Sequence, residues 1–152
     1  MDYEKKLKEL NISLPEPPKA VASYVPVRQS GNTLYISGQI PIKDGVVVTT
    51  GKVIKDCTIE EATEAAKLCA INILANIKEH TGDLNRVKAI IKLTGYVNCL
   101  EDFYQSPAVI NGASNLFVDI FGDAGKHARA AVGVAQLPLN ATVEVDAIVE
   151  LL

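Results

Sequence analysis

The segment RAAVGVAQLPLNATVEVD, from Arg129 to Asp146, places two charged residues in apolar, strand-like runs on either side of a Leu-Pro turn. On a strand, Arg129 shares a face with Ala131 and Gly133, because successive side chains alternate between the two faces. These small neighbours leave room for a ligand, and a guanidinium offers a planar fork that matches a carboxylate or a phosphate. The competing interpretation is a salt bridge with Glu144, or a strand-edge charge in solvent.

The geometry of a tight hairpin argues against a direct salt bridge. If Ala135 paired with Thr142, Arg129 would lie opposite Ile148, about four residues or roughly 13 Å along the strand from Glu144. The two charges converge only if another strand lies between their strands, or if they come from different subunits. The sequence leaves these alternatives open.

The composition predicts one globular domain over residues 1–152. The chain has 48% hydrophobic and 22% charged residues, and its length suits a single core. A net charge of −3 and a pI near 5.4 give no basic field for nucleic acid or an anionic membrane, so we expect a small-molecule partner. No run approaches the roughly 20 apolar residues of a membrane span, and the N-terminus lacks the apolar core of a secretory signal. We therefore expect a cytoplasmic location.

The cysteines and histidines do not form a recognisable metal or disulfide pattern. Cys57, Cys69 and Cys99 are widely spaced and odd in number, which predicts reduced thiols. His80 and His127 are few and far apart, so we expect no metal site.

The first part of the chain predicts an extension followed by a hairpin. Residues 1–19 are typical of a short helix and a proline-rich linker. Strands are expected over residues 23–29 and 33–37, joined by a Ser-Gly-Asn turn, with Pro26 favouring a sheet edge. A third short strand is indicated over residues 46–49.

Two long helices are expected in the rest of the chain. Thr58 and Glu61 form a capping box for the first helix, which should end near Gly82. Ser106 is the expected N-cap of the second helix, since a proline follows it, and Gly122 is placed to end that helix.

The order of the expected helices and strands, completed by the strands in the rest of the chain, predicts a mixed α+β fold. A central strand is expected over residues 86–98, where Gly95 indicates a bend or a close backbone approach. The last strand, residues 143–151, has apolar residues at six of its nine positions, which we take to predict burial on both faces. Two helices cover only one face of a single sheet. We therefore expect self-association over the other face, with ligand sites in clefts between subunits.

Four short motifs occur in the order SGQIPI at residues 37–42, AR before an apolar strand at 128–134, LP at 137–138 and VEVDAI at 143–148. From about Ala20 to the C-terminus, the chain resembles the Rid family, also called YjgF-type reactive-intermediate deaminases. The resemblance implies a chorismate-mutase-like fold with one mixed sheet and two helices on one face. It also implies a homotrimer with active sites in intersubunit clefts and no cofactor. Family members with the arginine hydrolyse reactive enamine or imine acids to 2-keto acids and ammonia.

The resemblance assigns roles to particular residues. Arg129 would bind the substrate carboxylate, and Glu144 would orient or activate the attacking water and shuttle protons. The other residues implied to line the pocket are Tyr24, Ser37, Gly38, Asn111 and Ala131.

The chain also departs from the family pattern near the arginine. Many deaminases of this type carry a cysteine at the position of Ala131 and a proline or alanine at that of His127. The stretch between the central strand and Arg129 is longer than expected. These departures alter the pocket floor and place the chain in a divergent branch.

The sequence therefore leaves three functional classes open. The first is the imine deaminase, and the second is a trimeric module that binds 2-keto acids or similar small carboxylates without turnover. The third is an RNA-directed translation inhibitor or endoribonuclease, against which the acidic balance argues. Chorismate mutase activity is suggested by fold likeness only.

Overall fold

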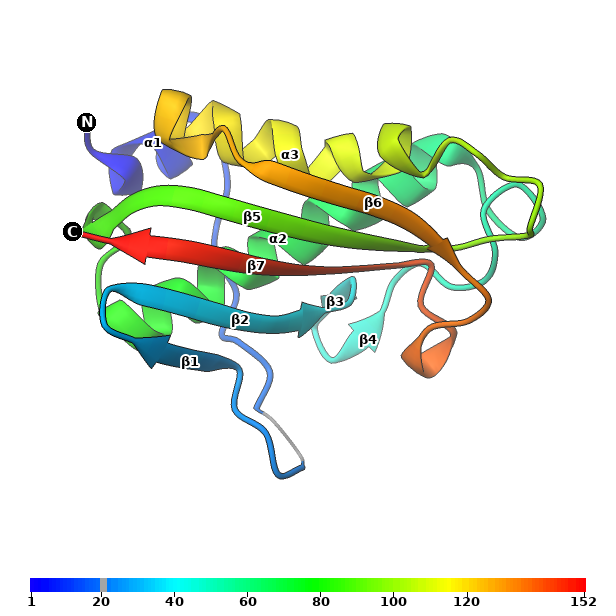
Figure 1. Ribbon diagram of the computed structural model, residues 1–152, viewed down its shortest axis with the longest axis horizontal. Helices are drawn as coiled ribbons and strands as arrows, with labels where there is room; N and C mark the ends of the chain where they lie inside the picture. The colour runs from blue at the N-terminus through cyan, green and yellow to red at the C-terminus, as the bar shows by residue number, and fades with distance from the viewer. Residues whose placement is uncertain (20–21) are drawn as a thin grey trace.

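The computed structural model describes residues 1–19 and 22–152 and shows a five-stranded mixed sheet in the order β1-β2-β7-β5-β6 (Figure 1). All neighbouring strands are antiparallel except β5 and β6, and β3 and β4 form a separate two-stranded ribbon. The strands are β1 (Val27–Ser30), β2 (Thr33–Gln39), β3 (Ile42–Lys43), β4 (Val46–Val47), β5 (Val87–Asn98), β6 (Ala128–Val134) and β7 (Val143–Leu151). The α-helices are α1 (Tyr3–Glu9), α2 (Ile59–Thr81) and α3 (Ser106–Phe121), with 3-10 turns η1 (Leu84–Arg86), η2 (Gly122–Gly125) and η3 (Pro138–Asn140). Ala20, near which the family resemblance begins, lies outside the described residues.

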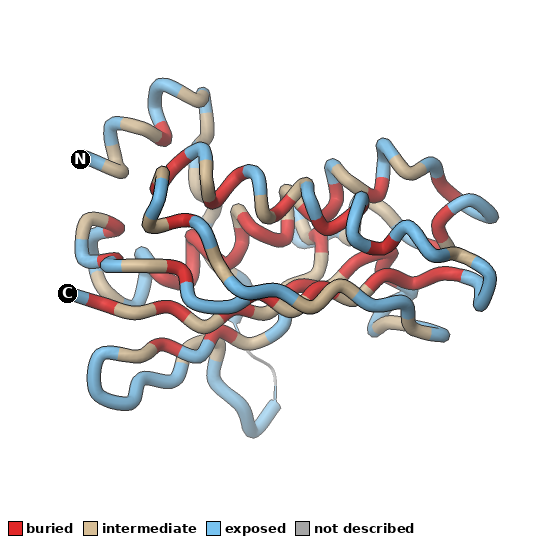
Figure 2. Tube along the Cα trace, turned by 45° about the horizontal axis from the view of Figure 1, so that its top comes forward, coloured by how far each residue is buried: buried red, intermediate tan, exposed pale blue. Residues whose placement is uncertain are grey.

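Helices α2 and α3 cover one face of the sheet, as the sequence predicted (Figure 1). Alternate residues of β7 are buried beneath them, and Phe117 of α3 is fully buried. Buried segments recur along the helices and the central strands in Figure 2. The third helix, α1, packs against the end of α3, where the rings of Tyr3 and Phe121 meet edge to face with centroids 4.6 Å apart.

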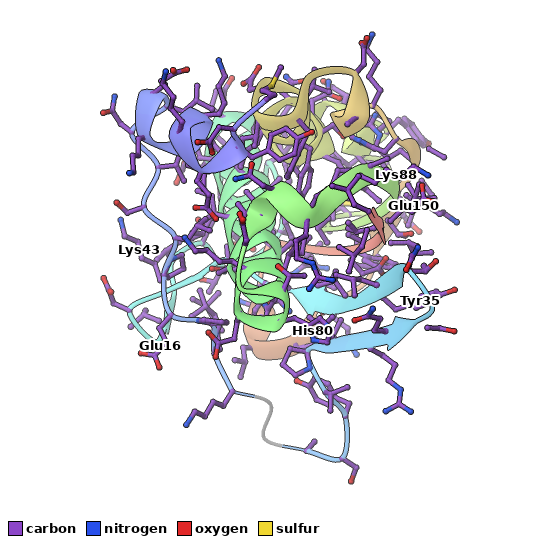
Figure 3. The ribbon with its side chains drawn as sticks, turned by 90° about the vertical axis from the view of Figure 1, so that its left-hand side faces the viewer. Glu16, Tyr35, Lys43, His80, Lys88 and Glu150 are labelled. Atoms are coloured by element: carbon purple, nitrogen blue, oxygen red, sulfur yellow. The ribbon has the colours of Figure 1, made fainter. Side chains whose placement is uncertain are left out.

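The opposite face of the sheet carries no helix among the described residues. Tyr35 is 50% exposed there and Val132 is 45% exposed. Lys88 and Glu150 form a salt bridge of 3.0 Å at the same end of the sheet as Tyr35 (Figure 3). Within the single chain the outward residues of β7 are only partly buried, so the burial expected on the second face stays a prediction about an assembly.

Helix α2 begins and ends where its sequence predicted. The Thr58 hydroxyl accepts a hydrogen bond from the Glu61 amide at 3.0 Å, and the Thr58 amide donates to the Glu61 carboxylate at 3.3 Å. Gly82 ends the helix in the left-handed region, with φ of 79°. The capping box is therefore confirmed.

The start of α3 differs from the prediction. Ser106 is the first helical residue, and its N-cap is Gln105, which makes no side-chain capping bond. The Ser106 side chain is buried instead, because the first turn of α3 packs near Gly133 of β6. Gly122 ends the helix as expected.

Strands β6 and β7 do not form a hairpin, because β5 lies between them. Their connection contains the turn η3, in which Leu139 and Asn140 have positive φ values of 56° and 57°. It is anchored beyond the end of β5, since Asn98 Nδ2 donates to the Ala141 carbonyl at 3.2 Å and the Thr142 hydroxyl donates to the Gly51 carbonyl at 3.0 Å. An intervening strand is therefore present within the chain, but it does not bring the two charges together, because they lie on opposite faces of the sheet.

The N-terminal strands agree with the prediction in kind and differ in length. The turn between Ser30 and Thr33 joins β1 to β2, and β1 is an edge strand, as predicted from Pro26. Strand β1 begins only after that proline, whereas β2 continues to Gln39. The third strand predicted at 46–49 is the shorter β4, which pairs with β3 outside the main sheet.

The three cysteines are buried free thiols.

Within residues 1–19 and 22–152, no helix combines the length and hydropathy needed to cross a membrane.

Candidate functional site

Arg129 lies on the edge strand β6 and contacts helix α3. Its NH1 nitrogen donates to Asn111 Oδ1 at 2.8 Å and to Ser114 Oγ at 3.2 Å. In the described part of the chain, no carboxylate lies within 4.0 Å of the guanidinium. The alternative of a salt bridge with Glu144 is therefore absent within the described residues. The exposed guanidinium is available to bind an anion from outside the chain.

Close packing of α3 on β5 brings Asn111 to Arg129. Gly95 of β5 pairs with Ala131 of β6, and a Cβ added to Gly95 would overlap the Ile110 side chain. The close approach predicted at Gly95 is confirmed. Ala131 is partly buried beside this contact, on the same face as Arg129.

Glu144 lies on β7, beside β2 and on the open face of the sheet. A Cβ added to Gly38 would lie 2.7 Å from Glu144 Oε1, so the carboxylate rests against the glycine backbone. Burial raises the pKa of the Glu144 carboxyl above its ordinary value, and the nearby Asp146 charge raises it further. Burial, followed by Asp146, also raises the pKa of Tyr96, whose hydroxyl donates to Asp146 Oδ2 at 3.1 Å.

Ser37 lies next to Gly38 on β2, and Tyr24 lies in the loop before β1. The Ser37 hydroxyl donates to the Val25 carbonyl at 2.7 Å and so fixes the loop before β1. Tyr24, next to Val25 in that loop, is 56% exposed. Ser37 thus anchors the segment that carries Tyr24.

The predicted site residues fall into two groups on opposite faces of the sheet. Leu93 of β5 pairs with Arg129 and is buried under the helices, whereas Tyr96 of β5 pairs with Glu144 on the open face. Strand β5 also separates the two charged residues by roughly 10 Å across the sheet. Within one chain, Arg129 and Asn111 therefore come together on one face with Ala131 beside them, and Glu144 rests against Gly38 on the other.

Sequence reasoning did not identify Ser114 and left the role of His127 open. Ser114 Oγ lies 3.2 Å from Arg129 NH1 and 2.9 Å from His127 Nε2. The signal for Ser114 was its position three residues after Asn111, which places both side chains on one face of a helix.

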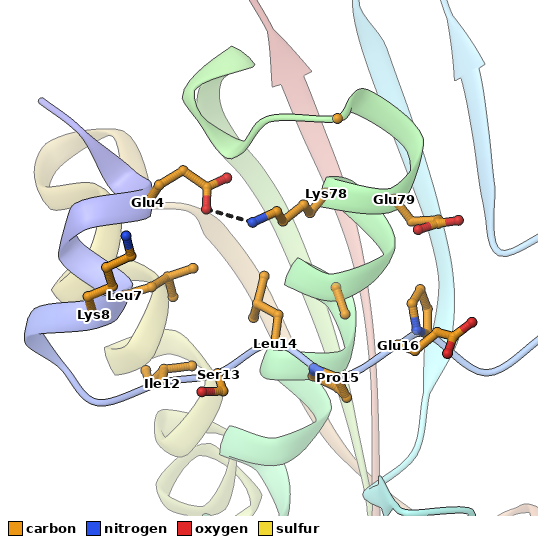
Figure 4. Close-up of a pocket in the computed structure, with 13 residues that line it drawn as sticks. Glu4, Leu7, Lys8, Ile12, Ser13, Leu14, Pro15, Glu16, Lys78 and Glu79 are labelled. Carbon is orange, nitrogen blue, oxygen red and sulfur yellow. Dashed lines mark hydrogen bonds and ion pairs between the residues drawn. The ribbon is translucent and has the colours of Figure 1, made fainter.

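Two grooves of the single chain are lined by residues of neither group. One, of about 730 Å³, runs between α1, the proline-rich linker and α2, where Glu4 and Lys78 form a salt bridge of 2.8 Å (Figure 4). Another, of about 660 Å³, is lined in part by Cys99, Phe103 and Gly133. No cluster of three or more potential metal ligands occurs within the described ranges.

Comparison with known proteins identifies the family. Residues 4–151 match the sequence model described as "YjgF/chorismate_mutase-like, putative endoribonuclease". The chain belongs to the YjgF family. It is 43% identical to Protein TCP17 of Trypanosoma cruzi over 95% of this chain and 91% of that protein. It is 31% identical to a 2-iminobutanoate/2-iminopropanoate deaminase of Dermatophagoides farinae, over 91% and 93% of the two chains.

A solved structure from Agrobacterium tumefaciens, described as a protein of unknown function, matches with a TM-score of 0.92 and 49% identity. The match covers 98% of this chain and 92% of that one. The YjgF/chorismate-mutase-like α+β fold expected from the sequence motifs is thereby confirmed.

Proposed function

We propose that this YjgF-family protein is a hydrolytic deaminase that converts reactive 2-enamine or 2-imine acids into 2-keto acids and ammonia. The observation that carries the proposal is the exposed Arg129 guanidinium, which is held by the neutral side chains of Asn111 and Ser114. Because the hydrogen-bond partners of Arg129 are uncharged, its guanidinium is available to bind an anion such as the carboxylate of a small molecule. Relatives named 2-iminobutanoate/2-iminopropanoate deaminase, from Dermatophagoides farinae and Mus musculus, support this substrate class.

The proposal includes a homotrimer whose active sites lie between subunits. Arg129 and Glu144 point to opposite faces of one chain, so a shared site requires a neighbouring copy. The open sheet face, with Tyr35 and Val132 exposed, offers a surface for such assembly. In this arrangement, Arg129 and Asn111 of one subunit face Glu144 of the next. Tyr24, Ser37 and Gly38 would belong to the same side of the cleft as Glu144.

The chemistry asked of these residues is modest. Arg129 binds the carboxylate of the imino acid through charge-assisted hydrogen bonds. A water molecule adds to the imine carbon while Glu144 accepts one of its protons and passes it to the nitrogen, which gives a carbinolamine. Glu144 then takes the proton of the carbinolamine hydroxyl and passes it to the amine nitrogen as the carbon–nitrogen bond breaks. One imine and one water thus give one keto acid and one ammonia. The raised pKa of Glu144 suits this proton transfer, and no cofactor is needed in the scheme.

Ala131 favours binding without turnover as a second candidate. It stands where many related deaminases have a cysteine, so a carboxylate could bind at Arg129 without the complete set of pocket groups. The RNA-directed alternative, which the family description names, has less support because the net charge is −3. We place the proposed reaction in the cytoplasm, where buried free thiols remain reduced.

The experiment is a coupled assay in which a threonine dehydratase generates the imine in situ and keto-acid release is followed. We expect acceleration by the wild type, and a loss of at least about tenfold in kcat/KM with Arg129→Ala or Glu144→Gln. The matched controls are Arg86→Ala and Glu79→Gln, which remove exposed charges of the same types elsewhere.

The outcomes separate the candidates. A folded wild type that gives no acceleration at any concentration contradicts the deaminase proposal. In that case, calorimetric binding of 2-oxobutanoate selects the binding module. Binding of labelled RNA at low salt, lost in Arg129→Ala but not Arg86→Ala, selects the RNA-directed activity.

A further inference from the structure

A second layer of side chains stands behind Arg129. Ser114 Oγ, on α3, lies between Arg129 NH1 at 3.2 Å and His127 Nε2 at 2.9 Å. His127 Nδ1 lies 2.6 Å from the carbonyl oxygen of Gly125, in the turn η2. Ser114 and His127 are both half-buried, so the chain of contacts runs inward from the exposed guanidinium.

The hydrogen-bond directions in this chain follow from the partners. A carbonyl oxygen only accepts, so His127 Nδ1 carries the proton in that contact. In the neutral imidazole, Nε2 is then an acceptor, and it takes the proton of the Ser114 hydroxyl. The Ser114 oxygen remains free to accept from Arg129 NH1. All the bonds therefore have one consistent set of donors and acceptors.

His127 is itself held in place by packing. Its ring meets Phe117 edge to face, with centroids 6.3 Å apart. Gly125 is buried against the end of α3, where a Cβ would overlap the Phe117 carbonyl group. This close turn presents the Gly125 carbonyl to the imidazole, and the imidazole orientation is thereby fixed.

The arrangement also determines which edge of Arg129 is available. NH1 has two hydrogens, and it donates to both Asn111 Oδ1 and Ser114 Oγ. The guanidinium keeps three further donors, one on Nε and two on NH2. A carboxylate would therefore meet the Nε–NH2 edge side-on, with one oxygen for each nitrogen, and not the NH1–NH2 end.

We propose that Ser114 and His127 are positioning residues that lock the Arg129 guanidinium, so that its Nε–NH2 edge receives the ligand carboxylate. This proposal names the binding geometry of the site and rests on the proposed function for the identity of that carboxylate. Ser114 acts directly on Arg129, and His127 acts through Ser114. Neither residue has a role in the family assignments drawn from the sequence.

The first test needs no ligand. The chain contains three arginines, Arg28, Arg86 and Arg129, so side-chain nitrogen NMR spectra of the labelled full-length protein are simple to assign with Arg129→Lys. A guanidinium locked at NH1 rotates slowly about its Cζ–Nε bond and gives resolved NH1 and NH2 signals. We expect resolved signals in the wild type and merged signals in Ser114→Ala.

Graded variants keep this test specific. His127→Gln supplies an amide oxygen as acceptor for the Ser114 hydroxyl, so it should keep more of the locking than His127→Leu. The matched control is Asn115→Ala, which removes the exposed neighbouring side chain on α3 and should leave the signals resolved. Merged signals in the wild type, or resolved signals in Ser114→Ala, overturn the proposal. If Ser114→Ala fails to fold, the comparison of the two His127 variants decides in the same way.

The second test measures the consequence for ligand binding. We expect Ser114→Ala to weaken 2-oxobutanoate binding by about tenfold, a size typical of one lost hydrogen bond to a charged group. In the coupled assay the loss should fall on KM, with kcat changed less than about threefold, because Glu144 is untouched. Equal binding by wild type and Ser114→Ala overturns the proposal. A wild type without binding or turnover contradicts the proposed function instead, and the NMR result then still decides whether Arg129 is locked.

Discussion

Gly38→Ala tests whether the position of the Glu144 carboxylate controls turnover. The added Cβ lies 2.7 Å from Glu144 Oε1 and 2.8 Å from its Cδ. A relaxed contact needs roughly 3.5 Å, so the carboxylate must move by about 0.7 Å. A displacement near 1 Å in a catalytic group can cost about 100-fold in rate. We therefore expect kcat to fall between about 10-fold and 100-fold, or roughly 1.4 to 2.7 kcal/mol in the barrier.

The same substitution should have little effect on binding and stability. In the proposed site the substrate carboxylate binds Arg129 of a neighbouring subunit, which the added methyl group does not displace, so KM should change less than about threefold. The atoms that must move belong to the end of a flexible side chain, so unfolding free energy should fall by less than about 1 kcal/mol. These quantities come from the coupled imine assay and from urea unfolding followed by circular dichroism.

Gly45→Ala is the matched control. Gly45 has open space around its Cα, but its φ is +78°. Alanine there should lower stability by about 1 to 2 kcal/mol and leave kcat unchanged. A Gly38→Ala protein with kcat within twofold of wild type would refute the assignment of Glu144 to the reaction.

Two further substitutions probe the charge and the packing of the site. The pKa of Glu144 is raised from 4.5, so the folded protein binds this proton more tightly than the unfolded chain, and stability falls as pH rises from 4.5 through the folded pKa. Glu144→Gln should therefore raise the urea midpoint at pH 7 but not at pH 4, while lowering kcat at least about tenfold. Equal urea midpoints of wild type and variant at pH 7 would contradict a destabilising carboxylate. Gly95→Ala should lower the free energy of unfolding by about 1 to 3 kcal/mol, because its Cβ overlaps the Ile110 side chain. Adding Ile110→Val should recover part of that loss in stability, as measured by thermal melting. An unchanged stability in the single variant would contradict the close packing of α3 on β5.

Local signals in the sequence were sufficient for the long helices. The capping box at Thr58 and Glu61 and the glycine at Gly82 act within one turn, so their geometry depends little on distant contacts. Ser106 has the composition of an N-cap, but its side chain is buried near β6 instead. A tertiary contact thus overrode the local preference, and no pattern in the adjacent residues indicates it.

The arrangement of the charged residues depended on pairing between distant segments. Arg129 and Glu144 are fifteen positions apart, but β5 separates their strands, and only the sheet order places them on opposite faces. The resemblance assigned Asn111 to the pocket, and its side chain is hydrogen-bonded to Arg129; its role in ligand binding stays a prediction. It gave no role to Ser114, although helical spacing from Asn111 predicts a shared face.

The most direct test of the central claim is complementation between two inactive variants. Arg129→Ala and Glu144→Gln chains are mixed under conditions that allow subunit exchange, and imine hydrolysis is compared with each variant alone. In randomly mixed trimers, about three quarters of the assemblies contain both chains, and each of these has one of its three sites intact. If Arg129 of one subunit acts with Glu144 of the next, about one quarter of the wild-type activity returns. Mixed trimers without any recovered activity, confirmed by mass spectrometry of the intact assembly, contradict a site shared between subunits.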